Sequence, residues 1–388
     1  MQVPLLDLKI QYRALKEEIE PKLKEIYEKQ YFILGPDVQS FEEKMAEYCG
    51  TNYAIGCASG SDALVLALMA CDVKQNDEVI TTPYTFFATA GAIARICAIP
   101  VFIDINPDDF NINPSLIEKF LEENAEKKDG EVYNKKTGRK IKAILPVHLY
   151  GQTADMRAIL AIAEKWGLPV IEDSAQSIGS IDGNLGKKAG NMGLIGCFSF
   201  FPSKNLGAFG DGGALTTNNE NIAKRLKSLR VHGESKRYYH DEVGFNSRLD
   251  AIQAAVLEIK LKYLEEWHKG RQENANFYNK AFEEANCEGI IATPKVLRNN
   301  RHIFNQYILR VKDRDKLVEF LRENNVGCAI YYPVPLHLQK CFEYLGYKEG
   351  DLPEAERAAR ETIALPIYPE LTEEQKQYVV DTILKFYS

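Results

Sequence analysis

A lysine that follows an apolar run is the residue in this chain best suited to covalent chemistry. The stretch CFSFFPSKNLGAFGDGG passes through Ser199 and Lys204 and closes with a glycine-rich loop. A second apolar run, VIEDSAQ, reaches Asp173. A lysine amine can form a Schiff base with an aldehyde, and a carboxylate can hold a protonated ring nitrogen. Lys204 and Asp173 together therefore predict a site for pyridoxal phosphate.

A turn of small residues supplies the anion site that this cofactor requires. The segment GCASGSDALVLAL begins as a strand, turns at Gly60, Ser61 and Asp62, and continues as a helix. Unpaired N–H groups at a helix N-terminus attract anions. We expect these three residues to donate to the phosphate, helped by the hydroxyl groups of Ser61 and Ser199. A helix capped by Ser61 or Asp62 would give the same pattern without any ligand.

Two further residues suit the aromatic ring of the cofactor. Phe86 follows the turn PYT, where it is placed to cover the ring face, and Gln176 lies three residues past Asp173, where it can donate to the ring hydroxyl. Taken alone, Phe86 fits a core aromatic better, and Gln176 fits an exposed polar residue equally well.

Alternating strands and helices are expected to position these residues. Strands are predicted at 53–58, 78–82, 100–104, 143–151, 168–176, 195–201 and 214–217. Helical patterns between them indicate right-handed βαβ units in a mostly parallel sheet. Ligands of such α/β sheets bind at the carboxyl ends of the strands, where His148, Asp173 and Ser199 fall.

The remaining segments predict a two-domain chain. We expect a large cofactor-binding domain at 1–250, and a linking helix with a smaller α+β domain at 251–388. An amphipathic helix within 6–30 is placed to pack on the small domain. The helix that begins at Ala251 is expected to run to about Glu273, and a strand is expected at CAIYYPV. The charged segment EENAEKKDGEVYNKKTGRKIK, with its Asp-Gly and Thr-Gly turns, predicts a surface hairpin.

Composition excludes several classes of function. The chain has 388 residues and a net charge of −7, which leaves no general basic surface for nucleic acid. Its eight cysteines are scattered without metal-ligand spacing, which favours reduced thiols in a cytoplasmic protein and no metal site. The N-terminus lacks the pattern of a signal peptide, and no apolar run has membrane-spanning length.

The motifs taken together resemble one protein family. GCASGSDALVLAL, TPYTFFATAGAI, VHLYGQ, VIEDSAQ, SFFPSKNLGAFGDGGA, RVHG and GFNSRLDAIQAA are similar, in this order, to motifs of the DegT/DnrJ/EryC1/StrS nucleotide-sugar aminotransferases. The resemblance implies an α/β architecture, the fold-type I of pyridoxal-phosphate transferases. It also implies a homodimer with shared active sites, and transfer of an amino group from an amino acid, usually L-glutamate, to a nucleotide-linked keto-sugar.

The same resemblance assigns roles residue by residue. Lys204 matches the Schiff-base lysine and Asp173 the partner of the pyridine nitrogen. Phe86 matches the stacking aromatic, Gln176 the group near the ring hydroxyl, and Ser61 and Ser199 phosphate ligands. Asn246 matches an asparagine that reaches the phosphate of the neighbouring subunit.

The form of the glycine-rich loop resembles the branch of the family that acts on 3-keto sugars. SFFPSK, NSRLD and YYPVPL are similar to enzymes that aminate UDP-2-acetamido-2-deoxy-3-oxo-glucuronate for surface polysaccharides. In that case Arg248 would pair with the substrate carboxylate and Tyr331 and Tyr332 would flank the sugar. Tyr331 stands where that subgroup often has histidine. Enzymes for dTDP-3-keto-6-deoxyhexoses share nearly the same loop.

Other functions fit the sequence less well. A 4-keto-sugar aminotransferase commonly carries a different loop, and some related sugar dehydratases replace the lysine by histidine, whereas Lys204 is present here. A nicotinamide dehydrogenase would show GxGxxG after its first strand, and GCASGS lacks that pattern. A catalytically silent regulatory protein on the same fold is the alternative from a different class.

Overall fold

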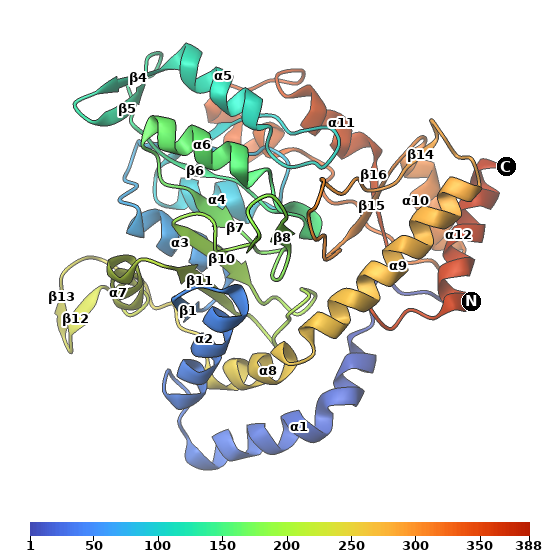
Figure 1. Cartoon of the computed structure of the whole chain (residues 1–388), viewed down its shortest axis with the longest axis horizontal. Helices are drawn as coiled ribbons and strands as arrows, with labels where there is room; N and C mark the ends of the chain where they lie inside the picture. Colours follow the sequence, from blue (N-terminus) through green and yellow to red (C-terminus); the bar gives the residue numbers. More distant parts are fainter.

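A computed structural model describes residues 1–388 of the chain. Two β-sheets lie edge to edge at the centre of the molecule (Figure 1). The four-stranded sheet has the order β1 (Tyr53–Cys57), β11 (Gly213–Thr217), β10 (Ile195–Ser199) and β7 (Ile171–Asp173). The three-stranded sheet has the order β3 (Ile99–Phe102), β2 (Glu78–Thr81) and β6 (Ile141–Leu145). Parallel bridges from Ile144 to Val170 and from Val147 to Asp173 join them.

The pairing confirms a mostly parallel sheet. β7 pairs with β10 in parallel, and β2 pairs in parallel with both β3 and β6. Only β11 runs antiparallel to its neighbours β1 and β10. The carboxyl ends of β7 and β10 therefore meet at one edge, with Cys197 paired to Asp173. This edge is where the candidate residues gather.

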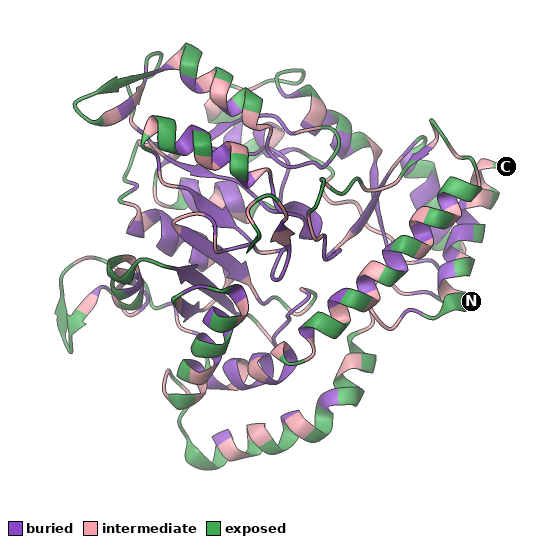
Figure 2. Cartoon of the chain, in the orientation of Figure 1, coloured by how far each residue is buried: buried purple, intermediate pink, exposed green.

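Helices cover the central sheet, and its strands are almost wholly buried between them (Figure 2). α3 (Gly60–Ala70) is apolar on nearly every side and lies within the core that also holds Ile171, Ile195 and Leu215. The other helices of this region are α2 (Pro36–Cys49), α4 (Ala88–Arg95), α5 (Pro114–Asn124), α6 (Met156–Trp166) and α7 (Glu220–Leu229). Short elements between them are the 3₁₀ turn Leu149–Gly151, β8 (Ile181–Asp182) and β9 (Lys187–Lys188).

The charged segment after α5 forms the hairpin that its turns predict. β4 (Ala125–Lys128) and β5 (Glu131–Asn134) pair antiparallel around Asp129 and Gly130, both in the left-handed region. Its far end is fixed to the sheet, because Asn134 and Thr137 donate to the carboxylate of Glu78 at 2.8 and 2.7 Å.

A smaller sheet and its helices form the C-terminal part of the chain. The sheet has the order β14 (Ile291–Ala292), β15 (Tyr307–Val311) and β16 (Thr362–Leu365), all antiparallel. Its helices are α10 (Arg314–Glu323), α11 (Pro353–Glu361) and α12 (Glu373–Tyr387), with 3₁₀ turns at Leu336–Leu338 and Lys340–Leu345. A separate hydrophobic cluster fills this part. The domain boundary at residue 250 stays a prediction.

The predicted linking helix is in fact two helices. α8 (Ala251–Leu261) ends before Tyr263, and α9 (Leu264–Glu284) continues at an angle toward the C-terminal sheet (Figure 1). The Tyr263 hydroxyl donates to Glu18, and its ring stacks on Trp267 at 6.2 Å. These contacts hold the junction, while α8 stays packed on the large sheet's helices.

The N-terminal helix packs on α8, the first helix of the region 251–388. α1 (Leu8–Lys29) buries Leu15 and Ile19 against Val256 and Ile259 of α8 rather than on the C-terminal sheet. The segment before α1 contacts the C-terminal part of the chain, since Val3 pairs with Val326 and belongs to the hydrophobic cluster of that part.

The strand predicted at CAIYYPV is not formed. The carbonyl of Tyr331 accepts hydrogen bonds from the phenols of Tyr84 and Tyr150 instead of a ladder N–H group. Only Ala329 makes a bridge, to Ala364 of β16. β16 itself, a strand the sequence pattern did not reveal, takes the place beside β15.

No helix combines the length and the apolar character needed to cross a lipid bilayer.

Candidate active site

Asp173 ends β7 as a buried carboxylate with fixed orientation. One oxygen, Oδ2, accepts from the Thr89 hydroxyl at 2.8 Å, and Oδ1 accepts from the N–H of Ala175 at 3.2 Å. Burial raises the pKa of Asp173, whereas these two hydrogen bonds and the positive charge of Lys204 act in the opposite direction. A carboxylate held in this way can face a cationic ring nitrogen.

Lys204 lies in the loop that follows β10. Its N–H donates to the carbonyl of Phe201 at 2.8 Å, which closes a tight turn. Burial lowers the pKa of Lys204 to about 8, and Asp173 opposes that shift. Asp173 pairs with Cys197 of β10, the strand whose following loop carries Lys204, and the charges of Asp173 and Lys204 act on each other. A lysine with this pKa has a sizeable neutral, nucleophilic fraction near neutral pH.

The turn before α3 leaves two backbone donors free. Ser59 is the N-cap, and its hydroxyl accepts from the N–H of Asp62 at 3.1 Å. The N–H groups of Gly60 and Ser61 cannot be satisfied within the helix. Glycine is required at position 60, since a Cβ there would lie 2.6 Å from the Cβ of Ser199. The cradle therefore presents Gly60, Ser61 and Ser199, while the N–H group of Asp62 is already used.

The carboxylate of Asp62 fixes a neighbouring extended segment. It accepts from the hydroxyl of Ser247 at 2.8 Å, and that hydroxyl also accepts from the N–H of Ala58 at 3.2 Å. Ser247 is fully buried, whereas Asn246 is exposed and Arg248 is half-buried with no ion-pair partner in the chain.

Gln176 and Tyr332 meet beside the ring site. The amide oxygen of Gln176 accepts from the N–H of Tyr150 at 2.7 Å, and its NH₂ group donates to the Tyr332 hydroxyl at 2.9 Å. The ring of Phe86 is 56% exposed and lies 6.1 Å from that of Tyr332. An aromatic this exposed at a site edge, and not in the core, has a free face for a planar ligand.

The sequence patterns did not indicate the residue that positions Tyr332, which is Tyr84. Tyr84 is fully buried, and its hydroxyl contacts Tyr331 O, Thr362 Oγ1 and Tyr150 Oη at 2.7, 2.7 and 3.1 Å. The N–H of Tyr332 donates to the same oxygen at 3.2 Å. This network joins the central sheet to the C-terminal part. No periodicity marks it, because its members come from four separate segments.

His148, which ends a predicted strand, is part of the support behind Asp173. Its Nε2 lies 2.8 Å from the carboxylate of Glu172, and both side chains are fully buried. The backbone N–H groups of Gly190, Met192 and Gly193 donate to the same carboxylate. Glu172 therefore fixes the loop before β10, on the opposite face of β7 from Asp173.

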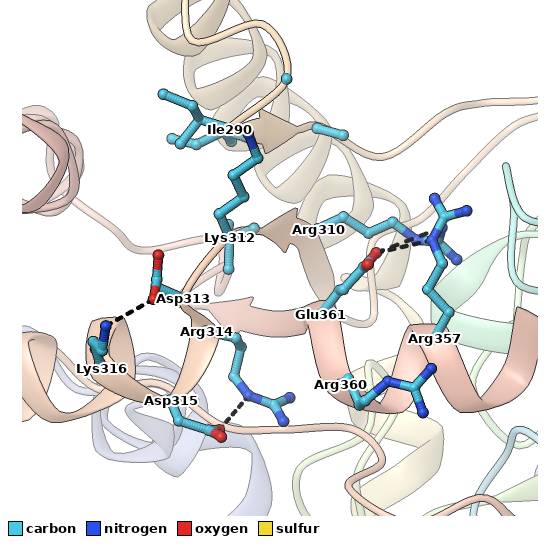
Figure 3. Close-up of a pocket in the computed structure, with 14 residues that line it drawn as sticks. Ile290, Arg310, Lys312, Asp313, Arg314, Asp315, Lys316, Arg357, Arg360 and Glu361 are labelled. Carbon is cyan, nitrogen blue, oxygen red and sulfur yellow. Dashed lines mark hydrogen bonds and ion pairs between the residues drawn. The ribbon is translucent and has the colours of Figure 1, made fainter. Parts of the chain in front are cut away.

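A cavity of about 740 Å³ lies away from these residues, between β15, α10 and α11 (Figure 3). Most of its charged side chains are paired: Arg310 and Arg357 contact Glu361, Arg314 contacts Asp315, and Lys316 contacts Asp313. Among its cations only Lys312 and Arg360 have no ion-pair partner within the chain. Neither Lys204 nor Asp173 lines this cavity, so its size does not make it the reaction site.

Fold and site define a class of enzyme. Pyridoxal phosphate needs a lysine of lowered pKa, a carboxylate at a neighbouring strand end, a helix N-terminus with free donors and an exposed aromatic, and the half-buried Lys204 and its neighbours supply them. The residues present fit the cofactor, so the chain is a pyridoxal-phosphate enzyme with an α/β sheet of the fold-type I kind.

The chain belongs to the DegT/DnrJ/EryC1/StrS aminotransferase family, whose model matches residues 13–384. It is a pyridoxal-phosphate-dependent sugar aminotransferase. A solved structure of ntda from Bacillus subtilis with bound cofactor PMP superimposes with a TM-score of 0.87 and 30% identity, covering 99% of this chain and 85% of the other. The resemblance drawn from the motifs is thereby confirmed for family, fold and cofactor.

Relatives with names cover nearly the whole chain. The "Pleiotropic regulatory protein" of Geobacillus stearothermophilus is 49% identical over 100% of this chain and 99% of its own length. The UDP-2-acetamido-2-deoxy-3-oxo-D-glucuronate aminotransferase of Pseudomonas aeruginosa is 39% identical over 95% and 96%. The dTDP-3-amino-3,6-dideoxy-alpha-D-galactopyranose transaminase of Aneurinibacillus thermoaerophilus is 38% identical over 99% of both.

Different residues of the chain would bind the cofactor and move the proton. When bound, pyridoxal phosphate supplies an electron sink for a carbanion beside the transferred nitrogen. Gly60, Ser61 and Ser199 would hold its phosphate, and Asp173 would keep a proton on its ring nitrogen. The amine of Lys204, with its pKa lowered to about 8, is able to take a proton from the substrate carbon and return it near neutral pH.

Proposed function

We propose that the chain transfers an amino group from L-glutamate to the 3-keto position of UDP-2-acetamido-2-deoxy-3-oxo-glucuronate, for surface polysaccharide biosynthesis. The 39% identity to the Pseudomonas aeruginosa enzyme over 95% of the chain carries the proposal. Arg248 supports it, because its guanidinium has no acid partner within the chain and suits a uronic carboxylate. Tyr331 and Tyr332 would flank the sugar.

A dTDP-3-keto-6-deoxyhexose is the second candidate substrate. The transaminase of Aneurinibacillus thermoaerophilus, at 38% identity, supports it almost equally. The purified enzyme, loaded with pyridoxal phosphate and glutamate, should be assayed against UDP- and dTDP-linked 3-keto sugars, each with and without a carboxylate. Preference for the UDP-linked uronate supports the proposal. Preference for a dTDP-linked neutral sugar replaces it with the second candidate.

Arg248→Gln should separate uronic from neutral substrates. Loss of a charged, two-pronged hydrogen bond costs about 1.5–3 kcal/mol, or roughly 10- to 100-fold in kcat/KM for the uronate. A neutral 3-keto sugar should lose less than about threefold, because it offers no carboxylate to pair. Steady-state kinetics on both sugars measure the difference. Equal losses on the two sugars would remove the carboxylate role of Arg248.

We further propose a homodimer in which Asn246 and Arg248 serve the active site of the other subunit. Asn246 is exposed, and Arg248 is half-buried without an ion-pair partner in its own chain. Beside them stands the hairpin β12 (Glu234–Lys236) and β13 (Tyr239–His240), which projects from the body of the chain (Figure 1). Its region carries exposed apolar side chains, Tyr238 at 77%, Tyr239 at 64% and Val243 at 88%. Exposed aromatic surface of this kind favours an interface.

Mixing two inactive variants tests the shared site. Protomers with Lys204→Ala and protomers with Asn246→Ala are refolded together, so that half of the dimers are mixed. A mixed dimer has one intact site if Asn246 acts across the interface, which returns about a quarter of the parent activity. Mixtures that stay as inactive as the separate variants would show that each subunit completes its own site.

A cytoplasmic location is proposed as well. All eight cysteines are free thiols, which favours a reducing compartment.

A further inference from the structure

A small cavity opens directly beside Lys204. It has a volume of about 180 Å³, far below the 300–1,000 Å³ typical of sites for drug-sized ligands. Its lining combines the loop of Lys204, the C-terminal strands and the N-terminal segment of the chain, and it includes Leu5, Lys204, Arg271, Gln306 and Tyr331. A nucleotide-linked sugar does not fit such a volume, whereas an amino acid does.

The charge of this lining is unbalanced. Arg271 is a permanent cation and Lys204 is protonated only in part, while no aspartate or glutamate is among the lining residues, although Glu370, outside this lining, acts on the charge of Arg271. The chain as a whole carries a net charge of −7, so a cavity with only positive groups is an exception within it. An anion of small size is the ligand that would balance these charges.

Arg271 is the unexplained member of this lining. It projects from α9 and is only 5% exposed, yet no carboxylate lies within ion-pair distance of its guanidinium. One nitrogen, Nη1, donates to the carbonyls of Phe304 and Asn305 at 3.0 and 3.4 Å. The Nε and Nη2 groups have no acceptor in the chain. Buried charges are normally paired, because an unpaired one is costly to desolvate.

Two more features favour a polar ligand in this cavity. The amide oxygen of Gln306 is buried without a hydrogen-bond partner. The N-terminal segment that lines one side is fixed in place, since Val3 accepts from the N–H of Gly327 at 2.7 Å and donates to Asn325 at 3.0 Å. A fixed wall and the guanidinium of Arg271 suit a carboxylate, whereas the free amide oxygen of Gln306 can only accept a hydrogen bond and suits the amine of an amino acid.

We propose that Arg271 binds a carboxylate of the amino-acid donor in the cavity that it shares with Lys204. The donor must bring its amine to the position of Lys204, so its carboxylate has to lie within a few bonds of that lysine. The guanidinium offers two free N–H groups in the geometry that a carboxylate accepts. This inference rests on the proposed glutamate donor, and it assigns Arg271 to glutamate while Arg248 serves the sugar.

The test follows the two halves of the reaction separately in the loaded enzyme. Bleaching of the bound cofactor by glutamate reports the donor half, and the return of colour with the keto-sugar reports the other. Arg271→Gln should raise the glutamate concentration needed for half-maximal bleaching by about 10- to 100-fold, the loss expected for a charged hydrogen bond. The keto-sugar concentration needed for half-maximal return of colour should change less than about threefold. Arg271→Lys should recover part of the glutamate affinity, because it keeps the charge.

Arg360→Gln is the matched control. Arg360 is exposed in the larger cavity of Figure 3, remote from Lys204, and its removal should leave both halves unchanged. If Arg271→Gln slowed the glutamate half-reaction and the sugar half-reaction by the same factor, Arg271 would have a purely structural role. A selective loss for the uronic sugar would place the sugar carboxylate at Arg271. Either result overturns the proposal.

A binding measurement covers the case in which Arg271→Gln fails to fold. Glutarate has two carboxylates and no amine, so it can occupy the site without reacting. Calorimetry should show glutarate binding to the parent loaded enzyme and weaker binding to Arg271→Lys. Equal affinities would overturn the proposal. A parent enzyme that glutamate never bleaches would instead refute the proposed donor, which keeps the two failures distinct.

Discussion

Replacing Lys204 by alanine is expected to abolish turnover while leaving much of the cofactor bound. The variant loses both the covalent attachment and the group that moves the proton, and a positioned acid–base group alone contributes about 10²- to 10⁴-fold. The phosphate donors at Gly60, Ser61 and Ser199 are separate from the lysine and remain. Rates should fall at least 1,000-fold or so, in single-turnover and steady-state assays alike.

The measurement is a comparison of activity with the amount of cofactor that stays with the protein after gel filtration. Lys128→Ala, in the exposed hairpin, is the matched control and should behave as the parent does. Turnover by the Lys204→Ala protein at the parent rate would refute the assignment of the lysine.

Asp173→Asn should produce the second-largest loss of catalytic rate, after Lys204→Ala. Asparagine keeps the shape of the side chain and can still bond to Thr89 or Ala175, but it cannot hold a positive charge on a ring nitrogen. Removing one preorganised electrostatic partner typically costs about 10²- to 10³-fold in kcat. Because the substitution is isosteric, we expect the change in thermal stability to be small beside the change in rate.

Asp129→Asn, in the turn between β4 and β5, controls for the loss of one carboxylate from the chain. The rate of cofactor bleaching by glutamate is the quantity to compare. If the Asp173→Asn enzyme bleached as fast as the control, Asp173 would not act on the ring nitrogen.

Residues at strand ends were predictable because local sequence decides them. VIEDSAQ and CFSFFPSK each combine a buried apolar run with one polar end, and parallel pairing of β7 with β10 brings those ends together. The turn at Gly60 is similarly local, since small residues before an apolar helix mark an N-terminus. The hairpin at 125–134 follows from its Asp-Gly turn.

Long-range contacts account for what the sequence did not reveal. Tyr84 and Tyr150 reach the carbonyl of Tyr331 from far along the chain, and their bonds remove the strand that CAIYYPV predicts. Tyr263, at the break between α8 and α9, donates to Glu18, which lies far outside any local window of sequence. Arg271 looks like an ordinary helix residue until the fold buries it beside Lys204.

We expect the amine of Lys204 and the carboxylate of Asp173 to serve one bound pyridoxal phosphate that exchanges amino groups with an amino acid. This expectation is tested most directly by the visible spectrum of the purified, loaded protein during titration with L-glutamate. Amino transfer predicts that the yellow colour bleaches toward the spectrum of the pyridoxamine form as 2-oxoglutarate appears in equal amount. A spectrum that no amino donor alters would contradict the account and leave a silent protein on the same fold.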